Sequence, residues 1–216
     1  MKILFQGDSV TDAGRDRSNP QDMGEGYPKY AAAMLQDSFP DETFEFCNLG
    51  ISGHRTEDLV ARLQSDFVDT QADIVSVLIG INDVWHHYSY GILTTDEAFE
   101  ANLKTIFTTI KEQMGAKLLV IQPFLLDVED KRELREELNR KQDILASLCQ
   151  TYADAYLPMD EIFSKEDAEV PTYYAADGVH PTPDGACYIG EAYLKAITPL
   201  IEAALCEGDF DTSNDL

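Results

Sequence analysis

Cysteine is scarce in this sequence, and its placement argues against two kinds of site. The four cysteines are far apart, form no C-x-x-C pair and lie mostly in apolar segments: Cys47, Cys149, Cys187 and Cys206. This pattern indicates small buried residues rather than a disulfide framework or a zinc site. His54, His86 and His87 also lack the ligand spacing of a known metal site. We therefore expect no metal and no organic cofactor.

Long apolar runs and basic residues are scarce too. No apolar run is long enough to cross a bilayer, and the first strand-like segment starts directly after Met1, which leaves no room for a signal peptide. We therefore expect a cytoplasmic protein. With 16 Lys and Arg against 40 Asp and Glu, the net charge is −24. Such a field repels phosphate, so nucleic acid and an anionic membrane are excluded as expected partners, and a neutral substrate fits better.

The chain is long enough for one full core. Its 216 residues have an ordinary apolar fraction and no linker rich in Pro, Gly and Ser. This predicts a single domain, which we assign to residues 1–206. Residues 207–216 are acidic, and we expect them to form a disordered tail.

Apolar periodicity alternates between strand-like and helix-like segments. Short apolar runs predict strands at residues 3–5, 44–49, 74–79, 117–121 and 155–157. Steps of three and four residues predict helices at 27–39, 59–67, 99–114, 134–148 and 183–205. Thr182 is the expected cap of the last helix, with Pro183 at its first position. This alternation predicts an α/β protein with a five-stranded parallel sheet in the order 2-1-3-4-5.

In such a sheet, a ligand lies beyond the carboxyl ends of the strands, near the switch point between the first and third strands. Four polar segments can meet there: residues 7–12, 50–56, 80–83 and 177–180. In the first of them, Gly7-Asp8-Ser9 follows a buried strand, and Ser9 could be held above the sheet as a nucleophile. The alternative is a plain polar turn.

Two of these segments carry groups that could stabilise an oxyanion. The backbone N–H of Gly53 and the side-chain amide of Asn82 are suitable donors. Each also has a simpler interpretation, because Gly53 could serve turn geometry with Thr56 as a helix cap, and Asn82-Asp83 could be an ordinary turn. Arg55 could pair with Asp83 or touch substrate.

The last segment combines an acid and a histidine. Asp177 precedes His180 by three residues with a glycine between them, so its carboxylate can bind Nδ1 of the imidazole and leave Nε2 facing outward. The alternative is a local turn hydrogen bond without a catalytic role.

Together these segments resemble a known family. Their order and spacing are similar to the four blocks of the SGNH (GDSL-type) hydrolases, with Val10 in place of the Leu of the GDSL name. The resemblance implies a three-layer α/β/α sandwich of flavodoxin-like order. It implies Ser9 as nucleophile, His180 as general base and then acid, and Asp177 as the group that orients His180. It further implies an oxyanion hole of the Ser9 and Gly53 backbone N–H groups and the Asn82 side chain.

A closer resemblance narrows the substrate. Residues 48–56, 79–85 and 177–181 look like the branch that contains intracellular acetylxylan esterases, although Ala176 stands where some relatives have Trp. This implies a serine esterase that removes acetyl groups from xylo-oligosaccharides or related carbohydrates. A lipid- or thioester-active acyl hydrolase is the main alternative, and a non-catalytic carbohydrate-binding protein is another. The resemblance leaves a homo-oligomer open.

Several further residues have expected roles around the pocket. The expected substrate contacts are His54, Arg55, Trp85, Tyr27 and Tyr174. Residues 85–90, interpreted as a loop, could wall the pocket or form an oligomer contact. The loop 12–26 could cover the crevice or meet another subunit. The alternating charges of residues 131–141 predict a solvated helix face.

Overall fold

The protein contains a five-stranded, fully parallel sheet. The computed structural model describes residues 1–166 and 173–211, with side chains to residue 206. The strands are β1 (Lys2–Gly7), β2 (Glu45–Asn48), β3 (Ile74–Leu78), β4 (Lys117–Ile121) and β5 (Ala155–Leu157). They lie in the order β2-β1-β3-β4-β5, and every neighbouring pair is parallel. The expected sheet and its strand order are confirmed.

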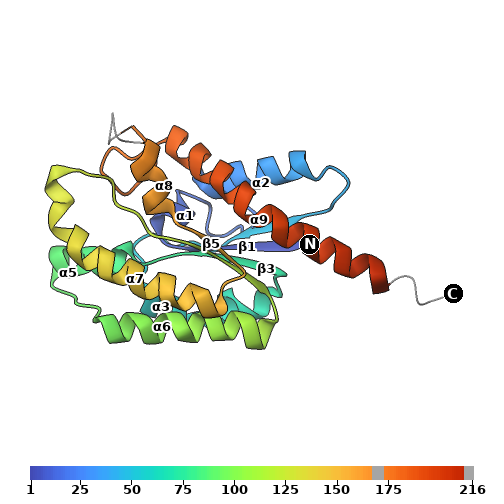
Figure 1. Ribbon diagram of the computed structural model, residues 1–216, viewed down its shortest axis with the longest axis horizontal. Helices are drawn as coiled ribbons and strands as arrows, with labels where there is room; N and C mark the ends of the chain where they lie inside the picture. Colours follow the sequence, from blue (N-terminus) through green and yellow to red (C-terminus); the bar gives the residue numbers. More distant parts are fainter. Residues whose placement is uncertain (167–172, 212–216) are drawn as a thin grey trace.

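Helices cover both faces of this sheet (Figure 1). On one face lie α2 (Tyr27–Ser38), α8 (Met159–Glu166) and the long α9 (Pro183–Asp211); on the other lie α3 (Thr56–Ala61), α5 (Ile81–Tyr90), α6 (Asp96–Thr108) and α7 (Arg135–Tyr152). The shorter elements are α1 (Ser9–Asp12), α4 (Leu63–Asp66), η1 (Val68–Thr70), η2 (Thr109–Met114) and η3 (Glu129–Leu134). The result is the three-layer α/β/α arrangement implied by the resemblance.

Side chains that alternate along β1 reach both layers of the core. Ile3 and Phe5 belong to the apolar cluster under α2 and α9, and Leu4 belongs to the cluster under α6 and α7. All three are fully buried. A strand buried on both faces reads as a continuous apolar run, which explains why this segment was recognisable in the sequence. Each such side chain stabilises the fold by about 1.5–3 kcal/mol. The central strand is therefore a rigid support for the loop that follows it.

Several expected elements differ from the structure. Residues 85–90 belong to α5 and not to a loop, and residues 159–166, for which the apolar pattern predicts no element, form α8. The helix expected over 59–67 is interrupted at Arg62, whose φ of −117° leaves the helical region. There the guanidinium turns inward and donates to the carbonyl of Leu49 at 2.8 Å. The helix α9 continues to Asp211, so the expected tail is helical over 207–211, and residues 212–216 lie outside the described residues.

The expectation of a solvated face over residues 131–141 is correct only in part, because Arg132, Glu133, Glu136 and Arg140 are exposed but three other charged side chains are not. Lys131, Glu137 and Lys141 are all less than one-tenth exposed. Their charged groups have partners on neighbouring elements: Glu137 contacts His87 of α5, and Lys141 donates to the carbonyl of Thr94 at 2.7 Å. Long charged side chains can be buried in this way when their ends are paired.

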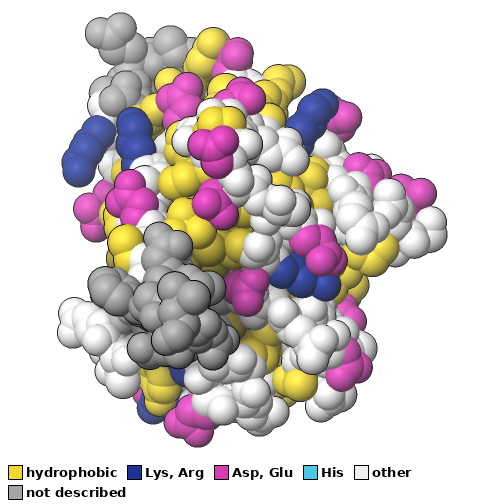
Figure 2. Space-filling model, turned by 90° about the vertical axis from the view of Figure 1, so that its right-hand side faces the viewer, with side chains coloured by type: hydrophobic (Ala, Val, Ile, Leu, Met, Phe, Trp, Pro, Cys, Tyr) yellow, Lys and Arg dark blue, Asp and Glu magenta, His cyan; other side chains and the backbone are white. Residues whose placement is uncertain are grey.

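The surface carries the negative charge seen in the composition. Acidic side chains are spread over the face in Figure 2, whereas basic side chains occur there in a few places only. None of the described helices combines the length and apolar character that a membrane crossing needs.

Candidate active site

The first segment of the site is the turn from β1 into α1. Gly7 is required there because a Cβ atom would lie 2.3 Å from the carbonyl oxygen of Leu78 on the adjacent strand. The buried carboxylate of Asp8 caps α1 by accepting a hydrogen bond from the N–H of Val10 at 3.0 Å. Ser9 is thus the first residue of a helix, half-buried at the carboxyl end of the sheet. Its backbone N–H lies in the first turn of α1, where helix N–H groups have no partner within the helix.

A hydrogen-bonded relay joins this turn to the loop before α9. Oγ of Ser9 lies 2.9 Å from Nε2 of His180, and Nδ1 of His180 lies 2.7 Å from Oδ2 of Asp177. The other carboxylate oxygen of Asp177 accepts from the backbone N–H groups of Val179 and His180 at 3.0 and 2.7 Å. Both oxygens of Asp177 are therefore occupied, and the imidazole ring is fixed with Nε2 toward the hydroxyl.

The electrostatics of the relay follow from this bonding. The hydrogen bond that the His180 imidazole donates to Asp177 raises the pKa of His180, against the opposing effect of burial. Burial alone would raise the pKa of Asp177, but the hydrogen bonds from His180 and Val179 outweigh it and hold that pKa well below its usual range. Asp177 is therefore ionised at neutral pH and favours a proton on the imidazole. Such an arrangement can accept a proton from a hydroxyl and stabilise the resulting imidazolium.

Gly178 gives this loop its shape. Its φ is +83°, and a Cβ would lie 2.7 Å from Cγ2 of Val128. Its carbonyl accepts from the N–H of Leu126 at 2.8 Å, which ties the loop to the segment after β4. The glycine between Asp177 and His180 is needed both for its left-handed backbone and for this close approach.

The relay opens into a pocket of about 230 Å³. Its lining comes from four parts of the chain: Ser9, Ser52, Gly53, Asn82, Trp85, His86, Tyr90 and His180. Gly53 has a φ of +83°. One N–H of the Asn82 amide donates to the carbonyl of His54 at 3.1 Å, which orients the amide and leaves its second N–H for the pocket. The two expected oxyanion donors from other loops thus lie in the same pocket as Ser9.

The acidic neighbour of Asn82 has a structural role. Asp83 is fully buried and accepts from the N–H and the hydroxyl of Thr56, the latter at 2.6 Å. It therefore fixes the start of α3 to α5. Burial raises the pKa of Asp83 to about 6. Arg55 pairs with Glu57 and lies 3.3 Å from the hydroxyl of Thr94, so the expected pairing with Asp83 is wrong.

Four of the five expected substrate contacts do not line this pocket, and Trp85 does. Tyr27 is fully buried, with its ring edge against Phe5, so it cannot reach a substrate. Tyr174 stacks on Tyr188 in the aromatic cluster under α9. His54 contributes its backbone carbonyl to Asn82, and Arg55 is held at α3. The burial of these two tyrosines could not be predicted from the sequence, because aromatic side chains occur both in cores and in pocket walls.

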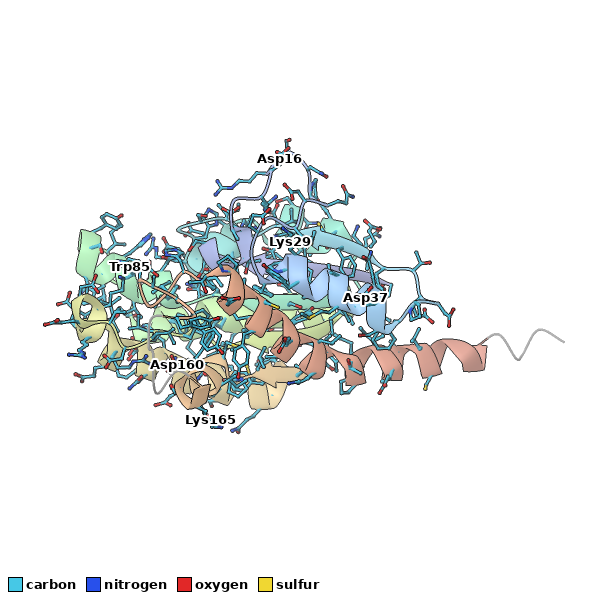
Figure 3. The ribbon with its side chains drawn as sticks, turned by 90° about the horizontal axis from the view of Figure 1, so that it is seen from above. Asp16, Lys29, Asp37, Trp85, Asp160 and Lys165 are labelled. Atoms are coloured by element: carbon cyan, nitrogen blue, oxygen red, sulfur yellow. The ribbon has the colours of Figure 1, made fainter. Side chains whose placement is uncertain are left out.

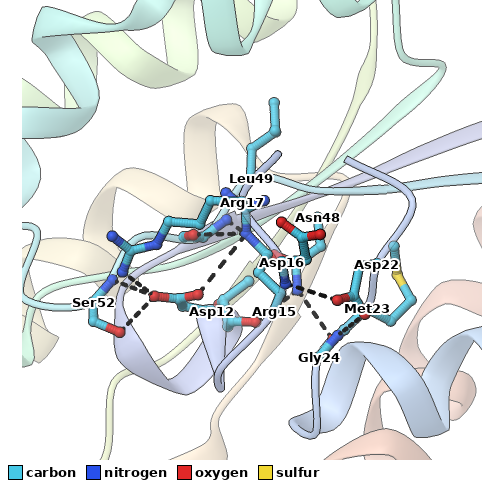
Figure 4. Close-up of polar contacts among 12 residues, drawn as sticks. Asp12, Arg15, Asp16, Arg17, Asp22, Met23, Gly24, Asn48, Leu49 and Ser52 are labelled. Carbon is cyan, nitrogen blue, oxygen red and sulfur yellow. Dashed lines mark hydrogen bonds and ion pairs between the residues drawn. The ribbon is translucent and has the colours of Figure 1, made fainter. Parts of the chain in front are cut away.

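Ser52 and Asp12 are parts of the site that were not anticipated (Figure 4). Oδ2 of Asp12 accepts from the N–H and the hydroxyl of Ser52 at 2.9 and 2.6 Å and also binds Arg17. The side chain of Arg15 donates to the carbonyl of Gly50 at 3.0 Å. The loop 12–26 is thereby fastened to the Gly53 loop. It contributes no residue to the described lining of the pocket. The sequence signal that could have indicated this contact is the acidic residue Asp12, one helical turn after Ser9.

Asp8 is the second buried acid next to the relay. It is fully buried, and burial raises its pKa to about 7. Its Oδ2 has no hydrogen-bond partner among the described residues. The site therefore keeps a carboxyl group that is easily protonated immediately before Ser9.

The helix α5 forms one wall of the pocket, at the end of the molecule where Trp85 is labelled in Figure 3. The indole lies 5.9 Å from the His180 ring between centroids, and His86 and Tyr90 meet edge to face at 5.1 Å. Tyr90 is 71% exposed.

A larger cavity of about 430 Å³ lies between α2 and β2, away from these residues, so volume alone does not identify the site. Within residues 1–166 and 173–206, no three His, Cys, Asp or Glu side chains are placed to hold a metal ion.

Known proteins resemble this chain over most of its length. The profile of the GDSL-like lipase/acylhydrolase family matches residues 5–186. An acetylxylan esterase from Geobacillus stearothermophilus is 28% identical over 205 residues, which cover 91% of this chain and 93% of that protein.

Solved structures agree with this. A protein from Parabacteroides merdae described as a GDSL-like lipase has a TM-score of 0.85 at 29% identity, covering 90% of this chain and 94% of its own. The acetylxylan esterase Axe2 from Geobacillus stearothermophilus has a TM-score of 0.83 at 27% identity, covering 90% and 92%. The sequence resemblance to GDSL-type hydrolases is thus confirmed. With a family profile that spans all four segments of the site, the chain belongs to the GDSL-like lipase/acylhydrolase family and is a carboxylic ester hydrolase.

Proposed function

We propose that this esterase removes short acyl groups, acetyl above all, from acylated carbohydrates such as xylo-oligosaccharides. The observation that carries the proposal is the relay from Ser9 through His180 to Asp177, which opens into the pocket that Gly53 and Asn82 also line. The similarity to an acetylxylan esterase over 91% of the chain supports the choice of acyl group and of carbohydrate.

The proposed reaction begins with Ser9 as nucleophile. His180 takes the hydroxyl proton through Nε2 as Oγ attacks the ester carbonyl carbon, and Asp177 stabilises the imidazolium. The carbonyl oxygen becomes an oxyanion that accepts from the N–H groups of Ser9 and Gly53 and from the Asn82 amide. Each donor lowers the barrier by about 3 kcal/mol in comparable hydrolases.

The second half of the reaction releases the acid. His180 returns its proton to the sugar oxygen as the C–O bond breaks, leaving an acyl-serine. Water then gives a proton to His180 while its oxygen attacks the acyl carbon, and Ser9 leaves as the hydroxyl with that proton. The products are an alcohol group on the sugar and a short carboxylic acid.

Two features support a short acyl group and a neutral partner. The pocket, at about 230 Å³, is smaller than the roughly 300–1,000 Å³ typical of sites for drug-sized ligands. The net charge of −24 opposes binding to an anionic lipid surface. The wall of Trp85 and Tyr90 offers flat apolar faces on which a sugar ring can stack.

Acetate release by the wild type and by Ser9→Ala tests the proposal. The panel consists of acetylated xylo-oligosaccharides, peracetylated monosaccharides and nitrophenyl esters from acetate to octanoate. We expect the wild type to release acetate from the sugars, Ser9→Ala to lose at least a factor of about 1,000 in kcat, and Ser18→Ala, an exposed control, to remain active.

Each deviation from this result has a defined meaning. Activity on long-chain esters alone would retain the serine mechanism and reject the carbohydrate substrate. Binding of acetylated sugar without turnover by the wild type would instead indicate a carbohydrate-binding role. Wild-type rates in Ser9→Ala would refute the nucleophile.

A further inference from the structure

The wall of the pocket contains the only tryptophan of the chain. Trp85 packs on the small apolar cluster between α5, η3 and α7, and its indole lies 5.9 Å from the His180 ring at an angle of 46°. The indole is thus in direct reach of the reacting imidazole. Any change in its tilt changes both the wall and the space in which His180 moves.

A buried lysine contacts the same indole. Nζ of Lys131, on η3, lies 5.0 Å from the centre of the Trp85 ring, in the geometry of a cation–π contact. Lys131 is only 8% exposed. It lines a separate cavity of about 300 Å³ formed by residues of the 125–135 segment, whereas Trp85 lines the Ser9 pocket. The cation therefore reaches the ring from outside the pocket.

The carboxylate next to Lys131 does not explain its burial. Asp130 lies 3.4 Å from Nζ, but its own side chain is 76% exposed. A pair with so exposed a partner is largely screened by water and contributes little. A lysine normally keeps its ammonium group in water, and an aromatic face is one of the few neutral surfaces that attract it. The contact with Trp85 is the stronger reason for this placement.

We propose that Lys131 is a positioning residue, whose ammonium group holds the Trp85 indole against His180 as the fixed wall of the Ser9 pocket. This inference rests on the proposed function for its kinetic consequence, but the placement of the indole is independent of it. Lys131 touches neither the substrate nor the reacting atoms in this account, and it acts through Trp85.

The position of Lys131 also has an electrostatic consequence. The charged groups that act on His180 are Asp177 in its own loop, Asp8 after β1 and Lys131 on η3. The two acids raise the pKa of His180, and Lys131 lowers it. Removing the lysine charge is therefore expected to raise the pH at which the imidazole loses its proton.

The single tryptophan makes the placement measurable without turnover. In Lys131→Met, which keeps most of the side-chain volume, we expect acrylamide to quench Trp85 fluorescence at least about twofold more efficiently than in the wild type. Because a protonated imidazole quenches a nearby indole, the fluorescence also titrates with His180, and we expect its midpoint to move to higher pH. Lys131→Arg keeps the cation, so its quenching and its midpoint should both match those of the wild type.

The control and the refuting result are equally direct. Lys104→Met removes an exposed lysine that pairs with Glu100 on α6, and it should leave the fluorescence unchanged. Melting temperatures show which variants are folded, and Lys131→Gln, which also removes the charge, replaces Lys131→Met if that variant is not folded. The proposal would be overturned if wild type, Lys131→Met and Lys104→Met had equal quenching and an equal midpoint. It would also be overturned if Lys131→Met differed from wild type and Lys131→Arg differed in the same way, because the cation would then not be the cause.

A double-mutant cycle tests whether Lys131 acts through Trp85. With nitrophenyl acetate, Lys131→Met should lower kcat/KM by about three- to tenfold in the wild type but less than about 1.5-fold in a Trp85→Leu background. An equal loss in both backgrounds would contradict the proposal. If the wild type hydrolyses no ester, the proposed function fails, whereas the fluorescence results still decide the role of Lys131.

Discussion

The backbone N–H and the hydroxyl of Ser52 both donate to one carboxylate oxygen, Oδ2 of Asp12, at 2.9 and 2.6 Å. Ser52 directly precedes Gly53, whose N–H is proposed to bind the oxyanion. Asp12 is 2% exposed and lies one helical turn after Ser9. The position of one proposed oxyanion donor is therefore linked to the turn that carries the proposed nucleophile.

This link predicts the effect of Asp12→Asn. The change removes a negative charge that faces two guanidinium groups. Nε of the buried Arg15 lies 3.9 Å from the carboxylate, and the partly exposed Arg17 pairs with it. Breaking a buried ion pair costs about 3–5 kcal/mol. We expect a melting temperature lower by about 6–20 °C, from about 2–4 °C per kcal/mol for this size, and kcat lower by about tenfold. Asp16→Asn, in the same loop but exposed, is the control for calorimetry and kinetics. Wild-type stability with wild-type kcat would contradict the link.

Gly53→Ala is expected to affect catalysis more than stability. A Cβ at this position meets nothing within 4 Å, so the change adds only the cost of a φ of +83°, about 1–2 kcal/mol. A small rotation of the peptide moves the N–H away from the oxyanion, and we expect kcat to fall about 10- to 100-fold.

Gly115→Ala is the matched control for this change. Gly115 has a φ of +67° and equally free space, but it lies at the end of η2 and outside the pocket. The two variants should melt at similar temperatures and differ in kcat. Equal kcat values would argue against Gly53 as an oxyanion donor.

The relay predicts the pH dependence of hydrolysis. His180 must be neutral to act as the proposed base, and the hydrogen bond that it donates to Asp177 raises its pKa from the ordinary 6.5. We therefore expect kcat/KM to fall as the pH drops through that raised pKa. In Asp177→Asn that support is lost. The acidic limb should then move to lower pH, while the plateau falls about 100- to 10,000-fold. Rates with nitrophenyl acetate between pH 4.5 and 9 measure both. An unmoved limb would contradict the coupling.

Asp8 predicts a pH-dependent stability. Burial raises its pKa from 3.8 to about 7, so the folded state holds the proton more tightly than the unfolded state. The stabilisation is present below pH 3.8 and is lost as the pH rises through about 7. Asp8→Asn does not titrate and can still accept from Val10. Its melting temperature relative to wild type should therefore rise between pH 5 and pH 8.5. Asp37→Asn, on the surface of α2, should show no such trend.

The fold was predictable because its strands are buried on both faces. Segments such as 74–78 read as apolar runs interrupted only by Ser76, and Gly7 and Gly53 stand where strands pass into loops, at positions where the structure needs glycine for space or for φ. The order of these loops was enough to bring Ser9, Asn82 and His180 to one edge of the sheet. The geometry of the relay then follows from the local turn at Gly178.

The roles that could not be predicted from the sequence depend on how deeply a side chain is buried and on which side chains of other helices and strands it contacts. Nothing in the spacing of Lys131 and Glu137 distinguishes a solvated helix from one whose charges meet Trp85 and His87. In the same way, Tyr27 and Tyr90 are the same residue type, but one is fully buried and the other is 71% exposed. Position in the third dimension, rather than residue type, decides these roles.

The contact between Ser9 and His180 joins residues 171 positions apart. One lies after the central strand β1, which pairs with both β2 and β3, and the other lies just before α9. A chain in which only one half has folded has the proposed nucleophile or the proposed base, but not both. Closing so long a loop is among the slower steps of folding, since its entropy must be lost before the contact forms. Recovery of ester hydrolysis during refolding would therefore report on completion of the entire sheet and not on any one part of it.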